Sequence, residues 1–369
     1  MNKTVVWVIV LVVIVGGIVL FAGKSGPTET GPIRIGVSAP LSGEAASYGE
    51  SVRAGAMLAQ KEINDAGGVD GRMIELIFED DTCAPAGISA MQKLVNIDKP
   101  HAVIGPVCSA VAGAAIPVAR KAGMPTIMVG ASAPGLAGGP DSIFSGYPSD
   151  SLQGKFAADY VFNTLGARKV AVLYVNNDWG VGLRDVFAPH FTSLGGQVVF
   201  NEGVAQTATD VRSQVTKIKS AAPDVVYIPL YPAGAVIAVK QLRDAGVNAK
   251  LIGGDALIGD EFLNSGVGEG VLMTAGDIGN TDEFKARVKA LTGVDPNILA
   301  PVAYDAIKVF AKVMGNRGTD AKDVIAGLNA LSYKDGVSFP SISFDQNGDL
   351  EVATYNVQVV QGGKAVPAQ

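Results

Sequence analysis

The most constraining feature of the sequence is a regular alternation between two kinds of segment, which begins near residue 33. Short runs of β-branched and other apolar residues, such as residues 33–37 and 170–175, are each followed by a longer Ala-rich stretch. In the first such stretch Val52, Ala56 and Ala59 are spaced by four and three positions, which places them on one face of a helix. Strands that alternate with helices indicate right-handed crossovers and a parallel sheet.

This pattern continues to about residue 253. Strands are predicted at residues 33–37, 73–78, 102–105, 125–129, 170–175, 198–201, 225–228 and 251–253, and helices at residues 52–63, 88–95, 112–122, 152–165, 181–194, 211–221 and 236–245. These are too many units for one comfortable open sheet. The sequence therefore predicts an α/β fold with two doubly wound parallel-sheet lobes.

The chain changes pattern after residue 280. Two long helices and then two strands are predicted there, at residues 302–313, 320–331, 341–344 and 355–360. Residues 345–349 read Asp-Gln-Asn-Gly-Asp, which resembles the start of a calcium loop. The twelfth position of such a loop needs Glu and is Asn356 here, so a turn is predicted and no metal site.

The first 31 residues are expected to form a separate part. Residues 5–23 are 19 residues without charge, and as a helix they would span roughly 28 Å, close to the ~30 Å hydrocarbon core of a membrane. A cleaved signal peptide usually has a shorter apolar run followed by small residues, and it is the alternative. We predict an uncleaved N-terminal transmembrane helix, with residues 24–31 as a polar tether.

Composition excludes several classes of function. Charged residues make up 17% of the chain and the net charge is −6, which disfavours nucleic-acid binding because phosphate contacts need basic residues. The two histidines, His101 and His190, lie in no recognisable motif and there are only two cysteines. A zinc site, a His-based catalytic triad and enzymatic activity in general are therefore not expected, and no cofactor is predicted.

Ligands of open parallel sheets bind outside the carboxyl ends of the strands, so the residues just after each strand are candidates for a site. Ser109 and Ser132 occupy such positions and offer hydroxyl groups, although both could be plain N-cap or turn residues. Asp255 follows another strand and could pair with a ligand ammonium or cap a short helix. Aromatic residues at further loop positions could wall a pocket or close a core: Tyr48, Trp179 and Tyr231.

Longer sequence blocks resemble a known family. The opening block reads IRIGVSAPLSGEAASYGESVRAGAMLAQKEINDAGGVDGRMIELIFEDD, and later blocks read VIGPVCSA, GMPTIMVGASAPGL, VLYVNNDWGVGL, DVVYIPLYPAGAVIAVKQLRDAGV and IGGDAL. In order and spacing they are similar to the type 1 periplasmic substrate-binding proteins, in particular the branched-chain amino-acid (Leu/Ile/Val) binding proteins of ABC importers. The similarity runs from about Ile33 to the C-terminus.

The resemblance implies a ligand site. It assigns the ligand carboxylate to Ser109 and Ser132, with backbone groups around Ala131, and the ligand ammonium to Asp255. The other residues that it implies contact the amino-acid backbone or shape the side-chain pocket: Tyr231, then Tyr48, Val107 and Trp179. The resemblance also implies a disulfide between Cys83 and Cys108, and hence an oxidising, extracytoplasmic setting; two free buried thiols are the alternative.

The resemblance further implies two lobes joined by a three-strand hinge, with the ligand in the cleft between them. The first lobe is expected at residues 32–150 plus 278–353, and the second at residues 151–277 plus 354–369. A permease and an ATPase in the membrane are the implied partners. The protein is then expected at the extracytoplasmic face of the membrane, or in the periplasm if the signal is cleaved.

The sequence is compatible with three functions. The leading one is a membrane-tethered solute-binding protein that delivers an amino acid, with an aliphatic side chain, to an ABC importer. The second is a ligand-sensing module that reports to a receptor. The third keeps the importer but changes the ligand to an amide, urea or aromatic acid, and the acid at Asp255 argues against it because such ligands carry no ammonium.

Overall fold

The strands of the protein are distributed over two separate sheets, as the alternation predicts. The computed structural model describes residues 30–43, 45–139, 141–351 and 353–368. Residues from Ile33 onward form one unit, which is described here by itself. The predicted membrane anchor at residues 5–23 lies outside the described residues. Within the described residues, no helix has the length and apolar character required to span a membrane.

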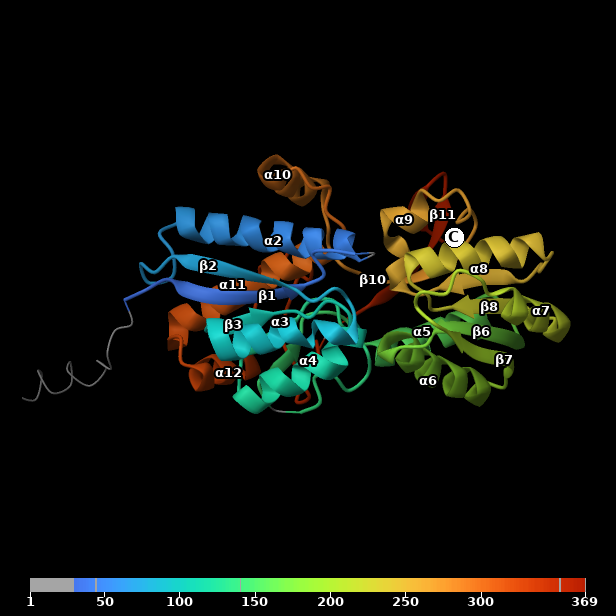
Figure 1. Ribbon diagram of the computed structural model, residues 1–369, viewed down its shortest axis with the longest axis horizontal. Helices are drawn as coiled ribbons and strands as arrows, with labels where there is room; N and C mark the ends of the chain where they lie inside the picture. The colour runs from blue at the N-terminus through green and yellow to red at the C-terminus, as the bar shows by residue number, and fades with distance from the viewer. Residues whose placement is uncertain (1–29, 44, 140, 352, 369) are drawn as a thin grey trace, which may run out of the picture. The chain divides into compact units, whose positions relative to one another are not determined.

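The first sheet is entirely parallel and has the strand order β2-β1-β3-β4-β5. Its strands are β1 (Ile33–Ala39), β2 (Ile74–Asp80), β3 (Ala102–Ile104), β4 (Thr126–Met128) and β5 (Ile143–Ser145). The helices around it are α2 (Ala46–Asp65), α3 (Ile88–Lys93), α4 (Ser109–Ala122), α10 (Asp282–Thr292), α11 (Leu299–Arg317) and α12 (Ala321–Asn329). Helices α2 and α11 pack together on one face, and α3 and α4 lie on the other (Figure 1). One hydrophobic core joins these elements.

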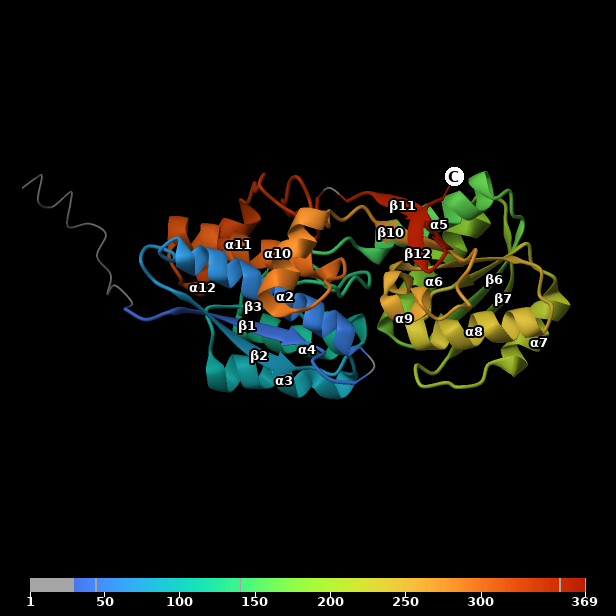
Figure 2. The ribbon, with the colours of Figure 1, turned by 90° about the horizontal axis from the view of Figure 1, so that it is seen from above.

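The second sheet has seven strands in the order β12-β11-β10-β9-β8-β6-β7. The strands are β6 (Lys169–Val175), β7 (Gln197–Val204), β8 (Val225–Ile228), β9 (Lys250–Gly253), β10 (Leu272–Gly276), β11 (Tyr355–Gln361) and β12 (Lys364–Pro367). Its helices are α5 (Asp150–Asp159), α6 (Asp178–Ser193), α7 (Arg212–Ala221), α8 (Pro232–Asp244), the short 3-10 turn η4 (Asp255–Ile258) and α9 (Asp260–Leu263). Six of the seven residues of β6 are buried, because α5 and α6 cover one face and α7 and α8 the other (Figure 2).

The structure corrects three details of the predicted elements. Strands β11 and β12 pair antiparallel, so the second sheet is not wholly parallel. Residues 341–344 form no strand and make only isolated bridges, Tyr333 with Ile342 and Phe344 with Leu350. Strands β5, β10 and β12 and helix α10 were not predicted; β5 escapes the strand–helix alternation because no helix separates it from β4. The predicted turn at residues 345–349 is confirmed, with Asp345 Oδ1 accepting from the backbone N–H groups of Asn347 and Asp349.

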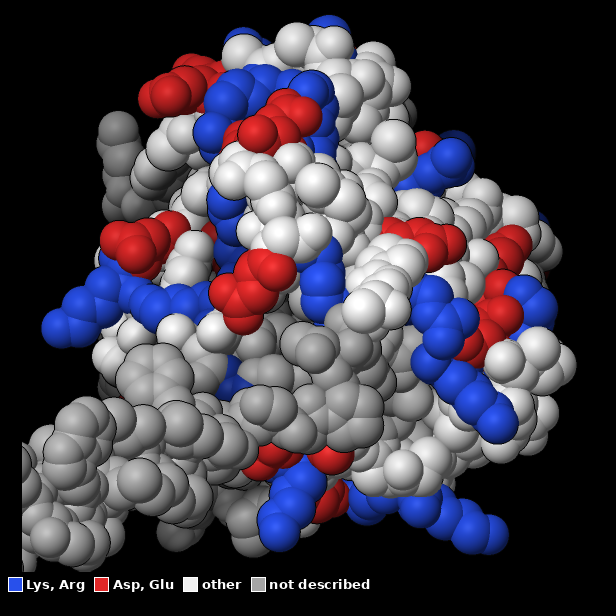
Figure 3. All heavy atoms as spheres, turned by 90° about the vertical axis from the view of Figure 1, so that its left-hand side faces the viewer, with Lys and Arg blue, Asp and Glu red and all other residues white. Residues whose placement is uncertain are grey.

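The chain passes three times between the two sheets. It leaves the first sheet after β5, returns to the first core between β10 and α10, and leaves it again between Leu350 and β11. The end of the molecule that carries α12 shows Lys, Arg, Asp and Glu intermingled, with no large area of one sign (Figure 3). In open parallel sheets, ligands bind at the loops that follow the carboxyl ends of the strands. A ligand site is therefore expected where such loops of both sheets meet.

Candidate ligand-binding site

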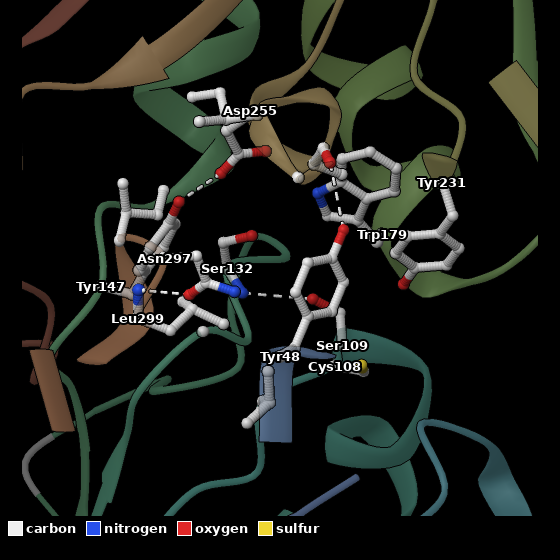
Figure 4. Close-up of a pocket in the computed structure, with 16 residues that line it drawn as sticks. Tyr48, Cys108, Ser109, Ser132, Tyr147, Trp179, Tyr231, Asp255, Asn297 and Leu299 are labelled. Carbon is white, nitrogen blue, oxygen red and sulfur yellow. Dashed lines mark hydrogen bonds between the residues drawn. The ribbon is translucent and has the colours of Figure 1, made fainter. Parts of the chain in front are cut away.

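A single cavity of about 70 Å³ brings together most of the residues that the sequence singles out. This is several times the ~10–15 Å³ that one water molecule requires. Its lining combines residues of both sheets: Tyr48, Val107, Cys108, Ser109, Gly130, Ser132, Tyr147, Trp179, Tyr231, Asp255, Ala256, Ile258, Gly259, Asn297, Ile298 and Leu299 (Figure 4). Of the eight predicted ligand-binding residues, seven line the cavity. Ala131 is fully buried between the lining residues Gly130 and Ser132 in the sequence and is not itself part of the lining.

The first sheet contributes two serines at strand ends. Ser109 is the first residue of α4, which begins shortly after β3, and Ser132 follows β4. The N-cap of α4 is Cys108, and no side chain caps that helix. The alternative of Ser109 as an N-cap is therefore wrong: its hydroxyl instead accepts from the backbone N–H groups of Ser132 and Ala133, each at 3.1 Å.

The hydrogen bonds of the two hydroxyls orient them differently. Ser109 Oγ accepts two bonds from the protein, so its single proton remains available to a ligand acceptor. Ser132 Oγ donates its proton to Asp150 Oδ2 at 3.0 Å, so its oxygen faces the cavity as an acceptor. The site therefore offers Ser109 to an anion and Ser132 to a hydrogen-bond donor. That both serines hold the ligand carboxylate stays a prediction, and these hydrogen bonds favour Ser109 for that role.

The second sheet contributes an acid. Asp255 follows β9 as the first residue of η4 and is 8% exposed. Burial raises the pKa of this carboxyl above its ordinary value, although the Tyr147 hydroxyl, which donates to Oδ2 at 2.7 Å, opposes the shift. Figure 4 shows this hydrogen bond between the Tyr147 hydroxyl and the Asp255 carboxylate. A buried carboxyl without a basic partner is a strong acceptor for a ligand ammonium.

Aromatic rings form the remaining walls. Trp179 and Tyr231 stack with their centroids 4.9 Å apart and 16° between their planes. Asn177 caps the start of α6, which positions the backbone of Trp179, because its side chain accepts from the backbone N–H groups of Trp179 and Gly180. Tyr48 reaches from α2 and donates to the carbonyl of Ala256 at 3.0 Å. Two tyrosines of the first sheet, Tyr48 and Tyr147, thus bond to residues of η4.

Several lining residues were not predicted. Tyr147 follows β5, a strand that the strand–helix alternation does not predict because no helix precedes it, and no other signal marked this residue. Ile298 and Leu299 lie at the start of α11, more than 150 residues beyond Ser132 in the sequence, and they enclose the cavity from the first core. The Pro301 that marks the first turn of this helix was the available signal, because the residues before it had to form a loop end.

The predicted disulfide between Cys83 and Cys108 is confirmed. It joins the loop after β2 to the residue that directly precedes Ser109. Asp81 supports the same loop: its carboxyl accepts from the Cys83 backbone N–H at 3.1 Å and from the Ser38 hydroxyl at 2.9 Å. The serine wall of the cavity is thus covalently tied to the edge of the first sheet.

The two sheets also meet along a tight seam beside the cavity. A side chain on Gly182 of α6 would come within 2.7 Å of Pro134 Cδ, and one on Gly113 of α4 would come within 2.4 Å of the Asp178 carboxylate. Helices α4 and α6 approach one another here because neither glycine carries a side chain.

Comparisons with known proteins identify the family of the chain. The family model described as periplasmic binding protein matches residues 32–364. A Pseudomonas aeruginosa "Amino acid binding protein" is 33% identical and covers 88% of each chain, and the Rhizobium johnstonii "Leu/Ile/Val-binding protein BraC3" is 33% identical over 93% of this chain and 95% of its own.

Two solved structures show the same fold. The leucine binding protein LivK from Thermotoga maritima has a TM-score of 0.84 with 25% identity, over 91% of this chain and 98% of its own. LivJ from Streptococcus pneumoniae, solved in complex with isoleucine, has a TM-score of 0.81 with 29% identity, over 91% of this chain and all of its own. The fold is the α/β fold of type 1 periplasmic binding proteins, and the chain belongs to the periplasmic binding protein family.

Proposed function

We propose that this protein is an extracytoplasmic solute-binding protein that captures an amino acid with an aliphatic side chain and delivers it to an ABC importer. The observation that carries the proposal is the composition of one cavity, which offers a hydroxyl donor at Ser109 and an acid at Asp255 from opposite sheets. A zwitterion presents an acceptor at one end and a donor at the other, so it suits both groups at once.

The apolar part of the lining supports an aliphatic ligand. Val107, Ile258, Ile298 and Leu299 offer hydrocarbon surface, and Trp179 adds a ring face. In the proposed pose the ligand carboxylate accepts from the Ser109 hydroxyl and from free N–H groups at the start of α4. The ammonium lies between Asp255 and the Ser132 oxygen, and the side chain lies against the apolar residues.

The proposed lobes are residues 32–150 plus 278–353 and residues 151–277 plus 354–369. The separate hydrophobic cores of the two sheets support this division. Because each lobe holds one end of the ligand, the ligand stabilises the closed arrangement relative to an open one. The closed form would then be recognised by a permease and its ATPase.

Members of this family act outside the cytoplasm, and the disulfide is in keeping with an oxidising compartment. We propose in addition that residues 5–23 tether the protein to the outer face of the cell membrane. Fractionation of cells without added protease tests the tether: recovery of the protein in the soluble extracytoplasmic fraction without detergent would contradict it.

A thermal-shift panel tests the proposed ligand. A ligand that binds only the folded state raises the melting temperature, by an amount that corresponds to ~2.7 kcal/mol when it is present at ~100 times its Kd. We expect leucine, isoleucine and valine to stabilise the protein, and leucinamide and 4-methylpentanoate, which each lack one charged end, to have little effect. Stabilisation by urea or short amides, with no response to any amino acid, would overturn the proposal.

A further inference from the structure

A buried acid lies directly behind the cavity and takes no part in its lining. Asp150 is the first residue of α5 and is fully buried. Its Oδ2 accepts from the Ser132 hydroxyl at 3.0 Å, while its Oδ1 is buried without any hydrogen-bond partner among the described residues. Burying a carboxyl oxygen without a hydrogen-bond partner costs free energy, so the presence of an acid at position 150 calls for a physical explanation.

The groups around Asp150 are acidic or neutral on every side. Its own helix α5 presents Gln153, whose amide donates to Thr274 of β10. Strand β8 presents the buried, unpartnered hydroxyl of Tyr227, and β11 presents Tyr355, which donates to the Ser149 carbonyl. The loop after β5 presents Tyr147, and η4 presents Asp255. Within the part of the chain that the structure describes, neither Asp150 nor Asp255 forms an ion pair with Lys, Arg or His.

Two buried carboxyls without a cation do not both ionise readily. Burial, together with the charge of Asp255, raises the pKa of Asp150 well above its ordinary value, and the hydrogen bond from Ser132 only partly opposes this. Burial likewise raises the pKa of Asp255. Asp150 lies behind the Ser132 hydroxyl, and Ser132 and Asp255 line the same cavity, so two buried acids without a cation flank this region and favour a state in which one proton stays on the pair.

We infer that Asp150 is a positioning residue for ammonium recognition, and that it shares with Asp255 a proton which the ligand ammonium displaces. The inference rests on the proposed function and deepens it. Asp150 accepts the hydrogen bond that the Ser132 hydroxyl donates, which leaves the lone pairs of the Ser132 oxygen available to the ammonium. The ligand-free pair carries one proton and one negative charge. On capture that proton passes to the solvent, and the doubly ionised pair faces the incoming positive charge.

The sign of the pH dependence follows from this exchange. Where capture releases a proton, acidification opposes it, so the affinity for leucine falls as pH falls, by at most about tenfold per pH unit. At pH values above the pKa of the ligand-free pair no proton is released and the affinity is constant. A site without a displaceable proton would show no such slope until the ligand carboxylate itself protonates.

Isothermal titration calorimetry of the full chain with leucine measures the released proton directly. Titrations at the same pH in two buffers of different ionisation enthalpy, repeated between about pH 5 and pH 8, give the number of protons released on binding. For the unaltered protein we expect a number between zero and one that grows toward the acidic end. No proton release anywhere in this range overturns the inference, and leucine binding in the same titrations leaves the proposed function standing.

Substitutions at Asp150 and Ser132 test whether Asp150 positions the Ser132 hydroxyl or only fills space in the core. Asp150→Asn should abolish the proton release and weaken leucine binding by about tenfold, which is one lost charge-assisted contact. Ser132→Ala should weaken binding to a similar extent, and the double variant should be no weaker than either single one, because Asp150 acts through the Ser132 hydroxyl. Fully additive losses overturn the positioning role. Unchanged proton release in Asp150→Asn overturns the shared proton.

Asp305→Asn is the matched control. Asp305 is also a buried acid, 2% exposed, that accepts from a serine hydroxyl, Ser338, but it lies in α11 away from the cavity lining. This variant should keep the proton release and the pH slope of the unaltered protein. If Asp150→Asn fails to fold, Ser132→Ala and the proton count of the unaltered protein still decide the matter. An unaltered protein that binds no amino acid overturns the proposed function and this inference together.

Discussion

The two walls of the cavity recognise opposite charges by different means. The wall from the first sheet is uncharged: it consists of serine hydroxyls and backbone N–H groups, held by the Cys83–Cys108 bond and by hydrogen bonds between loops. The wall from the second sheet relies on one buried acid, Asp255, and a stacked pair of rings. In the proposed pose, anion binding is therefore spread over several dipoles, whereas cation binding rests mainly on the one charged side chain, Asp255, with the Ser132 oxygen as an additional acceptor. The two walls should differ in how they respond to substitution.

Replacement of Asp255 should have the largest effect. Asp255→Asn keeps the shape of the side chain but removes its charge, and the loss of a buried charge-assisted contact of ~3 kcal/mol lowers leucine affinity by about 100-fold or more. The ligand-free variant should be at least as stable as the unaltered protein, because it no longer buries a carboxyl. Calorimetry and thermal unfolding measure both quantities.

An exposed acid in the neighbouring helix provides the control for that substitution. Asp260→Asn lies five residues further along, outside the cavity lining, and should leave leucine affinity unchanged. Equal affinities of Asp255→Asn and the unaltered protein would remove Asp255 from the site and with it the contrast between the walls.

Removal of the disulfide should weaken the serine wall as a whole. The double substitution Cys83→Ser and Cys108→Ser opens a loop with a sequence separation of 25 residues, which should lower the free energy of unfolding by ~3 kcal/mol. Leucine affinity should also fall, because Cys108 directly precedes Ser109. Urea denaturation with and without a reducing agent checks this: reductant should destabilise the unaltered protein and leave the variant unaffected. Thiol labelling of both cysteines in the exported protein would contradict it.

Loss of one hydroxyl should have a smaller effect than loss of the acid. Ser109→Ala removes one donor to the ligand, while the other donors of that wall remain, so leucine affinity should fall by roughly tenfold. Ser89→Ala, on the exposed surface of α3, serves as the control. A loss as large as that of Asp255→Asn would show that anion binding is also concentrated in one group.

The smallest expected effect is spectroscopic. Trp179 is 4% exposed and stacks on Tyr231, and the only other tryptophan of the chain is Trp7. In a Trp7→Phe background, saturating leucine should move the emission maximum of Trp179 by a few nanometres, because closure excludes water from the indole. An emission spectrum that stays the same at saturation would indicate that Trp179 does not sense the ligand.

Sequence reasoning reached the general site but not its details. Parallel strands place their following loops at one edge, so positions such as Ser109, Ser132 and Asp255 could be predicted to converge. The antiparallel edge formed by β11 and β12 could not, since strand direction depends on the path of the chain between the sheets. The direction of a hydroxyl proton depends on partners in other loops. The distinct roles of the two serines therefore emerge only from the hydrogen bonds at Asp150 and Ala133.

The seam between α4 and α6 has a consequence for how such a protein could evolve. Gly182 meets the ring of Pro134 so closely that even a methyl group has no room. Helix α6 is thus held against the loop that follows β4 by a contact with Pro134, a residue outside the cavity lining. A related protein that binds a larger ligand would therefore need smaller side chains in the cavity lining. Moving α6 away from Pro134 to make room would lose the close packing at Gly182.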